Sequence, residues 1–163
     1  GVVGAVGGED NDTINDFLIG YKEGAQYANP DIKVVTNYAN TYEDPAKGKE
    51  CALALNSQGA DVVFAVAGNT GNGVFAAAKE KGFYVIGVDQ DQKLSAPEYD
   101  EQIICSMKKE VGTSVYDTVK ALIEDDTWDG GRIWTADMAT EMRILLSRSA
   151  MISKRPQMIF KIR

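Results

Sequence analysis

The chain has 163 residues, of which 44% are hydrophobic, and its formal net charge is −7. This length and apolar content are sufficient for one domain with a real core. The negative charge excludes a general attraction to nucleic-acid phosphates or anionic lipids. No run of about 18 apolar residues occurs, so no transmembrane helix is predicted. Histidine is absent, which excludes Ser-His-Asp triads, Cys-His pairs and histidine-based metal sites.

The first half of the chain alternates short apolar runs with amphipathic stretches. Residues 2–6 form a predicted strand closed by two glycines, and residues 32–38 form the second strand. Between them, residues 12–28 carry a helical stripe of apolar side chains at Ile14, Phe17, Leu18, Tyr21 and Ala25. Asp44-Pro45 then opens a helix that runs to Gly59, with an acidic cap and proline in the first turn.

The second half continues the alternation. Residues 61–67 (DVVFAVA) are apolar almost throughout, as a central strand covered on both faces requires. The further predicted elements are a glycine-rich turn over 68–73, a helix over 74–81, strands over 83–88 and 102–107, and a helix over about 110–124. We therefore predict a three-layer, doubly wound α/β fold with a parallel sheet in the flavodoxin-like order 2-1-3-4-5. Phe64, Phe75 and Trp134 are assigned to the core.

The character of the chain changes after Gly131. Residues 132–163 contain seven basic and two acidic residues, and only residues 133–135 resemble a strand, a possible sixth. We predict a lobe over residues 1–131, followed by an edge strand and an atypical basic segment over 132–163. The basic segment has three open interpretations: an interaction tail, an amphipathic helix with a loose end, or a terminus foreign to the fold.

Two cysteines, Cys51 and Cys105, stand in apolar surroundings. Cysteine is commonly buried and no metal-binding spacing occurs, so two buried free thiols are the favoured interpretation. A disulfide between them stays open, because a pairing does not follow from sequence alone.

Four segments, in order, resemble one family. They are residues 3–25 (VGAVGGEDNDTINDFLIGYKEGA), residues 29–53 with an intact DPAKGK at 44–49, residues 58–92 (QGADVVFAVAGNTGNGVFAAAKEKGFYVIGVDQDQ), and residues 105–120 (CSMKKEVGTSVYDTVK). Together they resemble the basic membrane protein, or purine-nucleoside receptor, family of ABC-transporter substrate-binding lipoproteins. The chain departs from the family in having length for one lobe, the second, and in having Gly68-Asn69 where the family has two glycines.

The resemblance implies a non-enzymatic function without cofactor or metal. It implies one lobe of a periplasmic-type binding protein that captures a purine nucleoside reversibly. The implied partners are an ABC-transporter permease and the first lobe of the same protein, without nucleic acid. The implied location is extracytoplasmic, lipid-anchored at the cell surface or in the periplasm.

Asp89 and Lys109 are the leading candidates for ligand contact. Asp89 ends the fourth predicted strand, at the edge where ligands bind in such sheets, and a carboxylate there can accept two hydrogen bonds from a ribose diol. In the resembled family an aspartate and a lysine at these positions hold the sugar, and the match favours Lys109 over Lys108. Asp91 is expected to be a turn carboxylate and Tyr42 a half-buried loop aromatic.

Two further groups are weaker candidates. Gly68, Asn69 and Gly71 belong to a turn whose backbone N–H groups, before a helix, could bind polar ligand atoms; it matches neither a P-loop nor G-x-G-x-x-G. The alternative is a turn that only allows close packing. Glu9 and Asp10 follow the first strand and face the same cleft by topology, where they either contact ligand or cap the next helix.

Two other functions are compatible with this fold class. A sugar- or nucleoside-sensing domain of a transcription regulator shares the fold, but this chain contains no helix-turn-helix. A response-regulator receiver requires an acidic pair, a lysine and a phospho-acceptor aspartate. Glu9-Asp10 and Lys108-Lys109 supply the first two, but the third predicted strand ends without an aspartate, and its Asp61 lies at the opposite end.

Overall fold

The computed structural model describes residues 1–124, 127 and 131, and within them it contains a five-stranded sheet. Its strands are β1 (Val2–Gly7), β2 (Lys33–Tyr38), β3 (Ala60–Val66), β4 (Tyr84–Asp89) and β5 (Ile103–Lys108). All neighbouring strands are parallel, in the order β2-β1-β3-β4-β5. The predicted fold class and strand order are confirmed, and each strand end lies within one residue of its predicted position.

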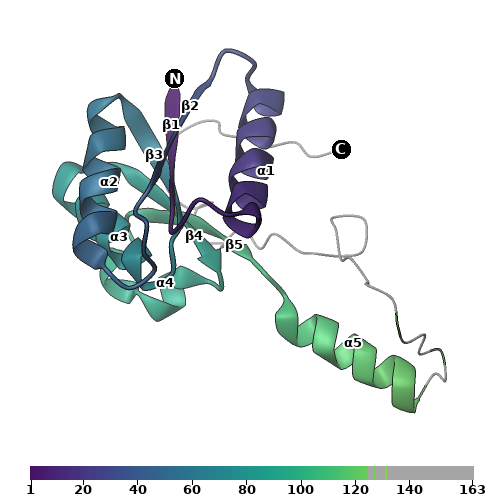
Figure 1. Cartoon of the computed structure of the whole chain (residues 1–163). Coiled ribbons are helices and arrows are strands. Elements are labelled where there is room, and N and C mark those ends of the chain that lie inside the picture. Colours follow the sequence, from purple (N-terminus) through teal and green to yellow (C-terminus); the bar gives the residue numbers. More distant parts are fainter. Residues whose placement is uncertain (125–126, 128–130, 132–163) are drawn as a thin grey trace.

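Helices cover both faces of the sheet (Figure 1). Helix α1 (Asp12–Ala28) packs on one face, while α2 (Pro45–Ser57) and α3 (Gly71–Lys81) pack on the other. Successive strand side chains point to opposite faces. Phe64 therefore joins the core under α1, and its neighbour Val63 joins the core under α2 and α3. The buried side chains of Phe64 and Phe75 confirm two of the three aromatic core assignments.

Helix α2 begins as its sequence predicts. The Asp44 carboxylate accepts hydrogen bonds from the N–H groups of Ala46 and Lys47, and Pro45 occupies the first turn. These contacts satisfy N–H groups that have no partner within the helix. The helix ends at Ser57, and Gly59 takes a φ of +94° before β3 begins.

The beginning of α3 corrects the sequence prediction. The chain forms a short 3-10 turn, η1 (Gly68–Thr70), and α3 starts at Gly71, three residues before the predicted residue 74. Glycine has low helix propensity, so these residues gave no helical signal. The close approach of α2 explains why glycine is needed at Gly73. A Cβ on Gly73 would come within 1.8 Å of the Pro45 carbonyl oxygen, and one on Gly48 within 2.0 Å of the Thr70 carbonyl oxygen.

This contact predicts that Gly73→Ala and Gly48→Ala each destabilise the domain by about 1–3 kcal/mol or more, because backbone must move to admit a methyl group. The control is Gly20→Ala in α1, where a Cβ meets open space. That substitution should stabilise by about 0.5–1 kcal/mol through helix propensity. Urea unfolding of the three variants measures the difference. Equal stability of Gly73→Ala and the unchanged chain would contradict the described helix contact.

The connection between β4 and β5 contains two short helices that the sequence did not predict. They are α4 (Gln92–Ser95) and the 3-10 helix η2 (Pro97–Tyr99). Asp91, expected to be a turn carboxylate, accepts a hydrogen bond from the Lys93 N–H and caps α4. Lys79 donates to the Glu98 carbonyl and ties η2 to α3. Four residues are too few for an apolar period, so only their caps could have signalled these elements.

Helix α5 (Val111–Ile123) confirms the last predicted helix but stands away from the sheet (Figure 1). It has no buried residue, and its apolar side chains are exposed at Val111, Val115, Tyr116, Val119, Leu122 and Ile123. On the α1 side of the sheet, Tyr84 of β4 is also 49% exposed. The fourth and fifth strands are therefore less covered on this face than the first and third.

The position of α5 predicts a contrast between two identical substitutions. Val115→Ala should change stability by less than about 0.5 kcal/mol, because this side chain is 57% exposed. Val63→Ala should cost about 2 kcal/mol or more, since Val63 is fully buried and its removal leaves a cavity. Thermal unfolding compares the two. If Val115→Ala lowers the stability as much as Val63→Ala does, the apolar face of α5 is buried against the rest of the protein and the described exposure is wrong.

Both cysteines are free; Cys51 is buried and Cys105 is partly buried. The prediction of two free thiols is confirmed, although Cys105 is less enclosed than expected. Burial raises the pKa of both thiols, so they are less reactive than an exposed cysteine.

The C-terminal predictions fall outside the described residues. These are the sixth strand over 133–135, Trp134, and the basic segment over 132–163, so the division at residue 131 stays a prediction. In the part of the chain that the structure does describe, no helix is both long and apolar enough to cross a bilayer.

Candidate functional site

The candidate site lies at the carboxyl edge of the sheet, beside the point where the strand order reverses. The helix after β1 covers one face and the helix after β3 covers the other, so the two connections leave in opposite directions. In open α/β sheets this divergence creates the crevice in which ligands bind. Two hollows open here, and they share Gly68, Val88 and Asp89.

The first, the aromatic hollow, has a volume of about 160 Å³. Its walls come from α1, the loop after β2, and the ends of β3, β4 and β5. The lining residues are Thr13, Ile14, Phe17, Tyr42, Val66, Ala67, Gly68, Val88, Asp89 and Lys109. Apolar walls with polar groups at one end are typical of small-molecule sites.

Asp89 has an unusual backbone for a non-glycine residue. Its φ is +66°, and the Gln90 N–H donates to the Val88 carbonyl at 2.8 Å, which closes a three-residue γ-turn around it. This hand of γ-turn is rare and strained. Strained residues of this kind cluster at functional sites. The turn raises the Asp89 carboxylate out of the strand and leaves it about half exposed at the rim.

Lys109 holds this carboxylate from the neighbouring strand end. Its Nζ lies 3.1 Å from Asp89 Oδ1, and its backbone N–H donates to the Asp89 carbonyl at 3.0 Å. The same ammonium lies 5.8 Å from the centre of the Phe17 ring, within the range of a cation–π contact. One carboxylate, one ammonium and one aromatic ring thus meet at the rim.

Tyr42 forms the opposite wall. Its hydroxyl accepts a hydrogen bond from Asn11 Nδ2 at 3.0 Å, which links the loop after β2 to the start of α1. The Tyr42 ring lies against Gly8, where a Cβ would come within 2.2 Å of it. The expected half-buried loop aromatic is confirmed, and a glycine after β1 is required for its position.

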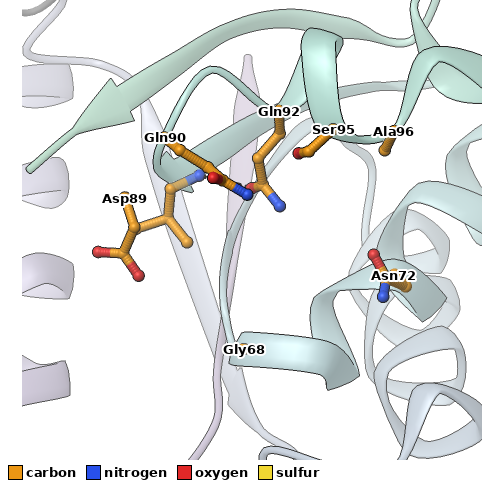
Figure 2. A pocket seen from close by; sticks show the side chains of 8 residues that line it. Gly68, Asn72, Asp89, Gln90, Gln92, Ser95 and Ala96 are labelled. Carbon is orange, nitrogen blue, oxygen red and sulfur yellow. Dashed lines mark hydrogen bonds between the residues drawn. The ribbon is translucent and has the colours of Figure 1, made fainter.

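The second, the amide hollow, has a volume of about 330 Å³ and lies between α3 and α4. It adds Asn72, Gln90, Gln92, Ser95 and Ala96 to the three shared residues. Figure 2 shows the Asp89 carboxylate turned away from Gln92 and Asn72. The carboxylate therefore points away from the amide hollow, whose other polar side chains are neutral amides and a hydroxyl.

The glycine-rich turn contributes less than the sequence suggested. Gly68, with a φ of +54°, lines both hollows. Asn69 and Gly71 line neither: the Asn69 side chain accepts from Asn72 Nδ2, and the Gly71 N–H is already bonded to the carbonyls of Asn69 and Gly68. Of the three candidates in this turn, Gly68 borders the candidate site and the other two do not, while Asn72, which was not a candidate, lines the amide hollow.

The acidic residues after β1 lie apart from the two hollows. Glu9 and Asp10 are exposed and line neither one. Asp10 accepts a hydrogen bond from Asn15 Nδ2, while Asn11 caps α1. Lys108 also points elsewhere and pairs with Glu110 at 2.6 Å. Of the charged candidates, the structure brings together Asp89 and Lys109.

Two site residues were missed from sequence. Phe17 was noted as part of the helical stripe, but its ring reaches the rim of the aromatic hollow. Its position one turn after the first loop was the available signal, because the first turns of α1 adjoin the carboxyl edge. Gln92 follows the predicted strand over 83–88 by four residues and was given no role, because no pattern marks it.

The chemistry of this arrangement is recognition. A carboxylate accepts hydrogen bonds, an ammonium donates them, and an aromatic face stacks on flat rings. Among residues 1–124, 127 and 131, no group of three or more Cys, Asp or Glu side chains could hold a metal ion. A parallel α/β lobe with a carboxylate, an ammonium and aromatic rings at its carboxyl edge has the features of a ligand-binding lobe.

Comparison with known proteins gives the family. The chain belongs to the Bmp family, ABC transporter substrate-binding protein PnrA-like, whose model matches residues 1–158. It is 42% identical over 134 residues to basic membrane protein D of Borreliella burgdorferi strain JD1. The matched region covers 81% of this chain and 38% of that protein. The chain thus spans about two fifths of the length of this relative.

Two solved structures have similar folds. An ABC transporter solute-binding protein from Aeropyrum pernix K1 is 35% identical, with a TM-score of 0.66, over 79% of this chain and 36% of that one. A transcriptional activator of the comK gene from Bacillus halodurans is 22% identical, with a TM-score of 0.64, over 81% and 44%. The second likeness shows the fold alone.

Proposed function

We propose that this chain is one lobe of a substrate-binding protein that captures purine nucleosides for uptake by an ABC transporter. The observation that carries the proposal is the meeting of Asp89, Lys109 and Phe17 at one rim of the sheet. Family membership supports the transport role. The nucleoside itself is argued from the chemistry of these three side chains.

Asp89 and Lys109 suit a sugar. A carboxylate can accept one hydrogen bond from each hydroxyl of a ribose diol, and a neighbouring ammonium can donate to the same oxygens. The existing ion pair keeps both groups at the rim before ligand arrives. Little side-chain ordering is then needed on binding, which favours affinity.

Phe17 and Tyr42 suit a base. The two aromatic side chains border the same hollow as Asp89, so a ligand anchored there by its sugar extends a flat ring toward them. Offset stacking on an aromatic ring contributes about 0.5–1.5 kcal/mol beyond burial alone. A molecule with a diol at one end and a planar ring at the other fits this division.

The lobe supplies one wall of the site. Its aromatic hollow of about 160 Å³ is smaller than the roughly 300–1,000 Å³ of typical ligand pockets. In the complete protein, a first lobe supplies the opposite wall, and closure about a hinge encloses the ligand. We propose an extracytoplasmic, lipid-anchored protein that passes the ligand to a permease.

This predicts weak binding by the chain alone. Pockets usually bury about 70–90% of their ligand, whereas one wall leaves much of a nucleoside in water. Calorimetry with inosine, adenosine and guanosine should give dissociation constants far weaker than those of a two-lobed relative. Micromolar or tighter binding by this chain would contradict the proposed division of the site.

A second prediction concerns Asp89 in a two-lobed protein that includes this lobe. Asp89→Ala should weaken nucleoside binding by about 1.5–3 kcal/mol, because hydrogen bonds to a charged group are lost. Free bases, which have no sugar, should lose much less. Parallel titrations with inosine and hypoxanthine measure the difference.

The matched control is Asp61→Ala, which removes the same charge from the exposed beginning of β3, at the opposite edge of the sheet. It should change neither affinity. If Asp89→Ala weakens inosine and hypoxanthine equally, the sugar assignment of Asp89 is wrong.

A further inference from the structure

We propose that Gln92 is a positioning residue that holds Asp89 in its binding geometry, an inference that rests on the proposed role of Asp89. Gln92 begins α4, three residues after Asp89, and its side chain returns to the end of β4. Its Oε1 accepts a hydrogen bond from the Val88 N–H at 2.7 Å. This bond adjoins the peptide that leads into the Asp89 turn.

The Val88 N–H needs this acceptor because the sheet ends beside it. In β4 the Val85 N–H donates to the Gln102 carbonyl and the Asp89 carbonyl accepts from Lys109, so the odd-numbered residues bond toward β5. Val88 therefore points its N–H toward β3. The register between β3 and β4 ends at Phe64 and Ile86, before Val88 is reached. A buried N–H without a partner would be costly.

Gln92 is itself fixed at its backbone. Its N–H donates to Ser106 Oγ at 3.0 Å, and the Ser106 side chain is buried in β5. Gly87 makes room for both groups: a Cβ there would come within 2.5 Å of Ser106 Oγ and 2.8 Å of Gln92 Oε1. The Gln92 clamp, defined as Gln92 with Ser106 and Gly87, is thus anchored in two strands.

The clamp acts on Asp89 through the γ-turn. Val88 donates its N–H to Gln92 and accepts from the Gln90 N–H through its carbonyl, so both of its polar groups are engaged around the strained residue. Without the acceptor, the Val88 N–H must find another partner and the turn can relax toward an ordinary φ. The Asp89 carboxylate would then leave Lys109 and the aromatic hollow.

Two substitutions of similar size distinguish the effect of the Gln92 hydrogen-bond acceptor from the effect of the packing of its side chain. Gln92→Glu keeps an oxygen for the Val88 N–H, whereas Gln92→Met keeps the length of the side chain and removes the acceptor. In the full chain, the three-bond coupling of the Asp89 amide proton reports its φ by NMR. We expect this coupling to change in Gln92→Met and to stay near its original value in Gln92→Glu.

The ligand readout uses inosine, titrated into a two-lobed protein that includes this lobe and followed through the Asp89 and Lys109 amide signals. Gln92→Met should weaken inosine about threefold to tenfold, as expected when one hydrogen bond is lost, and Gln92→Glu should largely restore it. Thermal unfolding verifies that both variants are folded at the temperature of measurement. An unchanged Asp89 coupling in Gln92→Met, or equal weakening by both variants, would overturn the inference.

Failure of the proposed function gives a different result. If inosine fails to bind a two-lobed protein that includes this lobe, the nucleoside assignment fails, while the Asp89 coupling in this chain still decides whether Gln92 holds the turn. A changed coupling in Gln92→Met that is restored by Gln92→Glu then supports the clamp. Without that change the clamp is rejected.

Discussion

The architecture depends on the need of an all-parallel sheet to bury both of its faces. Strand β3 meets this need with apolar side chains on either side, Val63 under α2 and α3 and Phe64 under α1. Helices α2 and α3 cover one face together and pack so closely that no space is left for a side chain at Gly73. Both faces are occupied, and the Asp89–Lys109 ion pair lies at the carboxyl edge of the sheet, where the two hollows open.

Most of the fold was predictable because its signals are local and periodic. Residues 61–67 read as a central strand from their apolar run, and residues 12–28 read as a helix from their stripe. The start of α3 was not predictable, because glycines at 71 and 73 lower helix propensity, and the reason for Gly73 is a contact with α2, which is distant in sequence. The family resemblance and the strand-end positions of Asp89 and Lys109 predict that these two residues belong to the site. Phe17 was missed since a stripe position does not tell whether a ring faces the core or a rim.

The strain at Asp89 connects the fold to the proposed function. A non-glycine residue with positive φ costs about 1–3 kcal/mol, so surrounding contacts must hold it. Here they come from both sides: Lys109 bonds its carbonyl and carboxylate, while Gln92 bonds the preceding N–H. These contacts lie at the end of the pairing between β4 and β5, where Asp89 is opposite Lys108. The carboxylate is thereby positioned before ligand arrives. The strain at Asp89 lowers the stability of the folded lobe, so it does not have to be created when ligand binds.

A lobe that positions its anchors in advance, yet leaves them half exposed, has a specific consequence for binding. Hydrogen bonds to Asp89 and Lys109 compete with water as long as the rim is open, so they contribute little net free energy. Closure of a second wall removes that water and strengthens the same bonds, since the local dielectric falls. Under the proposed function, the contacts of this lobe therefore give orientation to the ligand, and most of the affinity arises when the two lobes close. Reversible capture follows, because opening the cleft restores the competition from water and releases the ligand.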